Sequence, residues 1–111
     1  MKEKYAKCGL DYELILSKYP NIDEYEMIVN TYLQDEFFKD LETMINDDDF
    51  EMAKDATKGL YVLAGDLYLF PLYETLLEIY EDLEYETYKD LKTHYNEMIE
   101  KHQKIKQTFI V

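Results

Sequence analysis

Apolar side chains recur along most of the chain at intervals of three and four residues, which is the period of an amphipathic α-helix. This pattern predicts a short helix over residues 11–16, capped by Asp11 and ended by Pro20. A long second helix follows, with Asn21 or Asp23 as its cap. Its apolar stripe consists of Ile22, Tyr25, Ile28, Val29, Tyr32, Leu33, Phe37, Leu41, Met44 and Ile45.

A run of one asparagine and three aspartates at residues 46–49 ends this long helix, and a third helix follows over about residues 50–64. Acids are favoured there because the free N–H groups and the helix dipole at an N-terminus attract negative charge. Gly65 and Asp66 interrupt the pattern, and Asp66 is a suitable cap for the fourth helix. Pro71 is tolerated in that helix because it falls near the first turn.

The fourth helix runs to about residue 83, and a fifth contains His94 and His102. The apolar register of the fifth helix is Tyr85, Tyr88, Leu91, Tyr95, Met98, His102 and Ile105. Residues 107–111 are expected to fray, although the apolar segment 109–111 has the composition to dock on the rest of the molecule.

Short connections between the helices favour antiparallel neighbours. We therefore expect an all-α fold, an antiparallel up-down four-helix bundle with a short extra N-terminal helix, in which residues 1–111 form a single domain. Three glycines and two prolines supply too few turns for a β-sandwich or barrel.

The charge of the chain excludes several classes of partner. The sequence has 25 Asp and Glu against 12 lysines, with no arginine, and a formal net charge of −13. This negative charge repels nucleic acid and anionic membranes, so we expect neither as a partner. Self-repulsion favours a monomer. Because no apolar stretch resembles a signal peptide or a membrane span, a cytoplasmic location is the default expectation.

The single cysteine, Cys8, has no partner for a disulfide and no metal or redox motif around it. We expect an ordinary thiol in a frayed end. No metal site or cofactor is expected elsewhere either. Residues 47–51 lack the spacing of a calcium-binding EF-hand loop. Neither histidine follows a glutamate by three residues, as the ligands of a di-iron helical bundle would.

The third predicted helix has two distinct faces at about 100° per residue. The core face consists of Ala53, Ala56, Thr57, Leu60, Leu63 and Ala64. The opposite face, directed at solvent or a partner, consists of Asp55, Gly59 and Val62, flanked by Glu51, Met52 and Lys58. A glycine within a helix costs roughly 1 kcal/mol relative to alanine. Gly59 therefore either lets another molecule come close to the backbone or permits a bend.

The sequence Asp55-Ala56-Thr57-Lys58-Gly59, with Gly65 six residues further on, resembles the signature of histidine phosphotransfer (HPt) domains. That signature is His-x-x-Lys-Gly followed by a glycine near the end of the helix. The resemblance covers most of the chain: the first short helix at residues 11–13, the second helix at 25–33, the acidic turn at 48–51, and Leu69, Leu72 and Leu76 in the fourth helix. It implies a four-helix bundle.

The resemblance also implies a partner, namely a response-regulator receiver domain or a histidine kinase of a two-component phosphorelay. In this family the lysine helps to hold the phosphoryl charge and the glycine lets the receiver approach, and Lys58 and Gly59 match those positions. Asp55, however, occupies the position of the phosphoacceptor histidine. A carboxylate lacks the neutral nucleophilic nitrogen of imidazole and brings a second negative charge to a phosphoaspartate. Asp55 is instead placed to pair with Lys58, one helical turn away.

We therefore expect a module without enzymatic activity and without catalytic residues, which binds a receiver domain and does not accept phosphate. Asp55 marks the position equivalent to the phosphoacceptor. The expected receiver-docking surface consists of Lys58, Gly59, Met52, Val62 and Glu51.

Two other functions stay open. One is an acidic helical adaptor that binds an unrelated protein. The other is an active phosphocarrier that uses His94, His102 or Asp55. His102 continues the apolar register of its helix and is expected at the edge of the core with a local hydrogen bond, whereas His94 is expected in solvent beside Tyr95.

Overall fold

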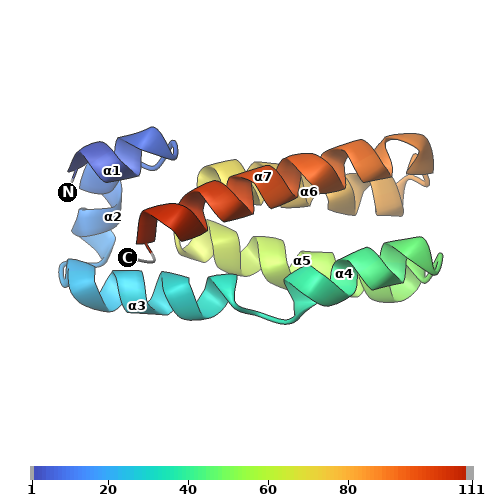
Figure 1. Cartoon of the computed structure of the whole chain (residues 1–111), viewed down its shortest axis with the longest axis horizontal. Coiled ribbons are helices and arrows are strands. Elements are labelled where there is room, and N and C mark those ends of the chain that lie inside the picture. The colour runs from blue at the N-terminus through green and yellow to red at the C-terminus, as the bar shows by residue number, and fades with distance from the viewer. Residues whose placement is uncertain (1, 110–111) are drawn as a thin grey trace.

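The computed structural model describes residues 2–109, which are helical over most of their length and contain no strand (Figure 1). The elements are α1 (Lys2–Lys7), α2 (Tyr12–Lys18), α3 (Ile22–Leu33), α4 (Phe37–Asn46), α5 (Phe50–Asp66), α6 (Phe70–Glu84), the 3-10 turn η1 (Tyr88–Asp90) and α7 (Leu91–Phe109). The predicted all-α class is thus confirmed for these residues. None of the described helices combines the length and the hydrophobicity needed to cross a bilayer.

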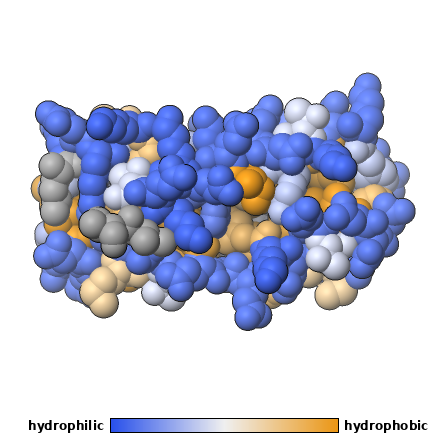
Figure 2. Space-filling model, in the orientation of Figure 1, coloured by the Kyte–Doolittle hydropathy of each residue, from blue (hydrophilic) through white to orange (hydrophobic). Residues whose placement is uncertain are grey.

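The longer helices lie side by side along the 40 Å axis of the molecule. α5 packs against α6 on one side and α4 on the other, while α7 packs against α6 and α3. Figure 1 shows α3 and α4 following one another along one edge, with α1 and α2 at the end where α3 begins. Hydrophilic residues predominate on the face shown in Figure 2, and hydrophobic side chains are visible only in small areas between them.

The predicted long second helix is wrong in one respect, because it is interrupted between α3 and α4. The N–H of Gln34 bonds back to the carbonyl of Thr31, and the side chain of Asp35 accepts a hydrogen bond from the N–H of Phe37 at 2.9 Å. Aspartate favours such breaks because its carboxylate competes for nearby backbone N–H groups. The interruption shifts the helical register, so Phe38 is buried and Phe37 is 48% exposed.

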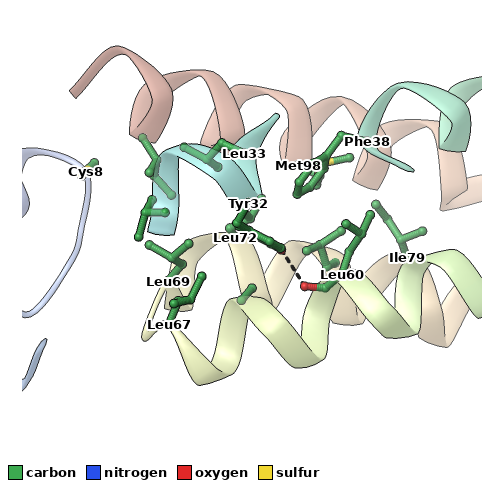
Figure 3. Packing of buried hydrophobic residues seen from close by; sticks show 14 of the residues in the cluster. Cys8, Tyr32, Leu33, Phe38, Leu60, Leu67, Leu69, Leu72, Ile79 and Met98 are labelled. Carbon is green, nitrogen blue, oxygen red and sulfur yellow. Dashed lines mark hydrogen bonds between the residues drawn. The ribbon is translucent and has the colours of Figure 1, made fainter. Parts of the chain in front are cut away.

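Two buried tyrosines of α3 form hydrogen bonds within the core to α5 and to Leu67, the residue that follows it. The hydroxyl of Tyr25 donates to the carbonyl of Leu67 at 2.6 Å, and that of Tyr32 donates to the carbonyl of Leu60 at 2.6 Å (Figure 3). Each ring thereby contributes apolar area while its hydroxyl remains hydrogen-bonded. Both tyrosines belong to the apolar stripe predicted for this part of the chain, and their burial confirms that placement.

The two ends of the described chain pack against each other. Phe109, the last residue of α7, is buried, and its ring centroid lies 5.1 Å from that of Tyr5 in α1 and 6.4 Å from that of Tyr25. The prediction of a frayed C-terminal segment is therefore wrong as far as Phe109, and docking of this residue is confirmed. Residues 110–111, the rest of that apolar segment, lie outside the described residues.

The predicted frayed N-terminus is also wrong. Residues 2–7 form α1, and Cys8 is buried, with only 4% of its surface exposed. Burial raises the pKa of the Cys8 thiol. Gly9 then turns the chain towards α2 at a φ of 76°, a conformation that suits glycine.

The connection between α5 and α6 differs from the prediction. α5 continues to Asp66, so Gly65 lies within the helix and Asp66 does not cap α6. Leu69 occupies the N-cap position without a side-chain hydrogen bond, and Pro71 lies in the first turn, as predicted.

Three helix connections hold a residue other than glycine at a positive φ. Asp48 precedes α5 at 57°, Tyr68 precedes α6 at 58°, and Glu86 precedes η1 at 59°. A left-handed conformation costs a residue with a Cβ roughly 1–2 kcal/mol. The packing of the flanking helices must therefore offset the free-energy cost of these turns.

We expect Phe109→Ala to lower the free energy of unfolding by about 3–5 kcal/mol, because it removes a buried ring at the meeting point of α1, α3 and α7. Denaturant unfolding followed by circular dichroism measures the loss. The control is Gln107→Ala, an exposed position on the same helix, which should change stability by less than about 0.5 kcal/mol. Equal effects of both variants would contradict the docking of Phe109.

Candidate functional site

The outward stripe of α5 is the face on which the sequence placed its candidate residues, and we call it the α5 face. It consists of Glu51, Met52, Asp55, Lys58, Gly59 and Val62, all of which are exposed. Met52 is 55% exposed and Val62 is 45% exposed. The buried residues of α5 are Ala53, Ala56, Thr57, Leu60 and Ala64.

One residue assigned to the core from the sequence lies outside it. Leu63 is 46% exposed, although it belongs to the predicted core face of this helix. Because Leu63 adjoins Val62 along the chain, the apolar exposure of α5 is broader than the sequence indicated.

A shallow hollow of about 280 Å³ lies beside Gly59, between α4 and α5. Its lining residues are Phe37, Met44, Met52, Asp55, Ala56 and Gly59. Phe37 and Met44 were predicted to be core residues, and the break before α4 turns Phe37 outward. The α5 face therefore continues onto α4 with an aromatic ring that sequence reasoning missed. The outward position of Phe37 could have been predicted from Asp35, because an aspartate side chain competes for nearby backbone N–H groups and can interrupt a helix.

A larger groove of about 940 Å³ lies between α3 and the C-terminal half of α5. Its apolar lining includes Met27, Ile28 and Leu63. Four acids also line it, namely Glu24, Asp35, Glu36 and Asp66, and no lysine does. Since both hollows lie between α5 and the α3–α4 pair, one side of the molecule offers two neighbouring apolar surfaces.

The charged residues of the α5 face are not paired with each other. Among residues 2–109 the ion pairs join other side chains, and the predicted Asp55–Lys58 pair does not form. The neighbouring Lys54 instead bonds Glu84 of α6 at 3.1 Å, which raises the pKa of its ammonium group. The carboxylate of Asp55 and the ammonium of Lys58 are thus both available to a partner.

The two glycines of α5 have different surroundings. A Cβ atom added to Gly59 would meet nothing within 4 Å, so internal packing does not require glycine there. A Cβ atom added to Gly65 would lie 3.3 Å from the Tyr73 ring of α6, so Gly65 lets the two helices approach closely. Of these two glycines, only Gly59 lacks a reason within the fold.

His102 lies where the sequence predicted it. It is 9% exposed, its Nε2 atom donates to the carbonyl of Leu33 at 2.7 Å, and its ring contacts Phe38. Burial lowers the pKa of this imidazole, with the nearby Lys106 acting in the same direction. A side chain in this position cannot meet the active site of another protein without local opening of the fold.

The prediction that His94 is solvated is wrong. Its Nδ1 atom lies 2.5 Å from a carboxylate oxygen of Asp82, and its Nε2 atom lies 3.2 Å from one of Glu78. Burial alone would lower the pKa of His94, but the bond to Asp82 and the charges of Glu78 and Glu97 raise it. Sequence reasoning missed these contacts because Asp82 and Glu78 come from α6, whereas His94 is in α7.

We expect Gly59→Ala to increase the free energy of unfolding by about 0.5–1 kcal/mol, because alanine is the better helix former and its methyl group meets no neighbour. The matched control is Gly65→Ala on the same helix. There the gain in helix propensity is opposed by the contact with Tyr73, so the increase should be smaller or reversed. Thermal and denaturant unfolding measure both variants. A loss of stability in Gly59→Ala would show that the fold needs this glycine.

No protein-family model matches this chain, and no curated protein or solved structure matches it either. The interpretation of the α5 face therefore rests on the residues and the geometry described above.

Proposed function

We propose that this chain is an HPt-like binding module of two-component phosphorelay signalling, which docks a receiver domain on the α5 face and does not itself accept phosphate. The observation that carries the proposal is Gly59. It is an exposed glycine in the middle of a helix with open space around it, and it lies between Asp55 and the exposed Val62. A bare backbone at such a position has a use when another molecule must come close.

The proposal includes the arrangement of the helices as a four-helix bundle, with α3 and α4 together as one interrupted member and α1 and α2 as additions at one end. The packing of neighbours supports it. α4 contacts α5, α5 contacts α6, α6 contacts α7, and α7 contacts α3, so the set closes on itself. In such a bundle the outward stripe of α5 is accessible along its length.

The chemistry of the α5 face supports docking rather than transfer. Met52 and Val62, together with Phe37 of α4, provide exposed apolar area beside Gly59. Such area stabilises a complex when it is removed from water. Lys58 adds a positive charge in a chain of net charge −13, suited to the acidic site that the resemblance implies in a receiver.

Asp55 determines the outcome of docking. Its carboxylate places a fixed negative charge where the related domains carry a histidine, and no imidazole is present on the α5 face. A carboxylate approaching a phosphoaspartate meets like charge, so phosphoryl transfer to it is unfavourable. Docking of this module would therefore occupy a receiver without discharging it. It would compete with a domain that can accept the phosphoryl group.

A second candidate is an acidic helical adaptor, and the groove between α3 and α5 favours it. The apolar and acidic residues that line it suit a partner segment that has apolar and basic side chains. The two candidates use different residues, since the groove involves Ile28 and Leu63 whereas receiver docking centres on Gly59. An active phosphocarrier is less favoured because His102 is buried and His94 is held by two carboxylates.

The docking proposal predicts micromolar binding of at least one receiver domain from the source genome, measured by isothermal titration calorimetry against each in turn. Gly59→Gln should weaken binding at least tenfold, about 1.4 kcal/mol, because its side chain fills the space that the partner must enter. Stability should not fall, since glutamine is the better helix former.

The control for this variant is Glu81→Gln, an exposed position on α6 outside the α5 face, which should leave binding unchanged. Receiver binding that is lost in Leu63→Lys and retained in Gly59→Gln would contradict docking at Gly59 and locate the contact in the groove between α3 and α5. If no receiver binds at micromolar concentrations, the docking proposal is wrong.

The second prediction of the proposal concerns Asp55. We expect the native protein to remain unlabelled when incubated with a radiolabelled phosphorylated receiver, whereas Asp55→His should gain an acid-labile label, because the imidazole restores the nucleophile beside Lys58 and Gly59. Asp55→Asn serves as the control and should remain unlabelled. Label on the native chain would contradict a module that does not accept phosphate.

A further inference from the structure

We propose that Glu78, His94 and Glu97 form a binding site for a divalent transition-metal ion such as Zn²⁺, with Asp82 as the residue that orients His94. Glu78 and Asp82 belong to α6, and His94 and Glu97 belong to α7. The site is separate from the α5 face, and α5 contributes no residue to it.

The ligand atoms are close enough to share one ion. The imidazole nitrogen of His94 and carboxylate oxygens of Glu78 and Glu97 all lie within 4.8 Å of one another. The Nε2 atom of His94 is 3.2 Å from the Glu78 oxygen. Two ligand atoms on a tetrahedral zinc ion, each bonded at about 2.0–2.1 Å, lie roughly 3.3 Å apart. This pair is therefore already at ligand spacing, and the exposed side chain of Glu97 has the freedom to complete it.

A buried carboxylate, that of Asp82, holds the orientation of the His94 ring through its Nδ1 atom. The side chain of Asp82 is 9% exposed, and its Oδ2 atom lies 2.5 Å from Nδ1 of His94. Its Oδ1 atom accepts a hydrogen bond from the hydroxyl of Thr87 at 3.0 Å, and the N–H of Thr87 bonds the Asp82 carbonyl. Asp82 thereby holds the proton of His94 on Nδ1 and directs Nε2 towards the two glutamates. Metal-bound histidines are oriented in this way by a carboxylate on the other ring nitrogen.

The charge of the site also favours a cation. The ion pairs of Glu78 and Asp82 in the described chain are with His94 alone, and Glu97 has no ion pair among residues 2–109. Even a protonated imidazole would leave two of the three negative charges uncompensated. Imidazole and carboxylate are both ligands of zinc and of other first-row divalent ions, whereas calcium and magnesium favour oxygen ligands alone. Water would complete the coordination.

The position of the site indicates a structural role. The ligands join α6 to α7 next to the connection that contains Glu86 and Thr87. An ion that binds only the folded chain stabilises it by mass action. Zinc would therefore fasten these two helices to each other near their connection.

The experiment is calorimetric titration of the full chain with Zn²⁺ in a buffer that does not bind metal, with thermal unfolding as a second readout. We expect one zinc ion per chain, a micromolar or tighter Kd, and a higher Tm with zinc. Glu97→Gln should weaken binding at least tenfold. This variant should fold normally, because the side chain of Glu97 is exposed and makes no ion pair with residues 2–109. Glu100→Gln is the matched control, with the same charge change one turn further along α7, and should bind as the native chain does.

Two further measurements test the assignment of roles. Asp82→Asn should weaken zinc binding tenfold to a hundredfold, the usual effect of losing an orienting partner. Nitrogen NMR of the two imidazoles should show a zinc-dependent shift at His94 and none at His102, whose Nε2 atom is bound to Leu33. The proposal is overturned by absence of binding at about 100 μM zinc, by equal affinity of the native chain and Glu97→Gln, or by unchanged His94 resonances.

Discussion

The burial of one stripe of α5 is the constraint on which the rest of this structure depends. Three alanines in that stripe, together with Thr57 and Leu60, let α5 lie between α4 and α6. With that stripe inside, the period of the helix puts Asp55 and Gly59 outside. The chemistry available to a partner on this side of the molecule is a direct result of the packing. No rearrangement of the side chains is needed to expose it.

The sequence predicted much of this because the relevant information is local. Apolar spacing alone located the α5 and α6 helices and the outward position of Asp55, Lys58 and Gly59. The break between α3 and α4 escaped prediction because neither glycine nor proline marks it. Hydrogen bonds from the N–H groups of Gln34 and Phe37 mark the break, and the shift of register across it leaves Phe38 buried and Phe37 exposed.

Other features escaped prediction because they depend on contacts between distant parts of the chain. The ring of Tyr5 in α1 contacts the ring of Phe109, and these two residues lie near opposite ends of the sequence. His94 meets carboxylates that precede it by 12 and 16 positions on another helix. The spacing of apolar residues at intervals of three and four contains no information about contacts between residues so far apart in the sequence. For the same reason the sequence revealed the α5 face and failed to reveal the surroundings of the histidine.

The three turns with positive φ at Asp48, Tyr68 and Glu86 have a consequence for how the molecule folds. Each turn is unfavourable when considered alone, since none uses the glycine that would relieve the strain. The contact between two helices joined by such a turn must first offset this strain, so packing against further neighbours adds to the stability of each pair. The helices should accordingly assemble together, so that the native state is gained and lost as a cooperative unit.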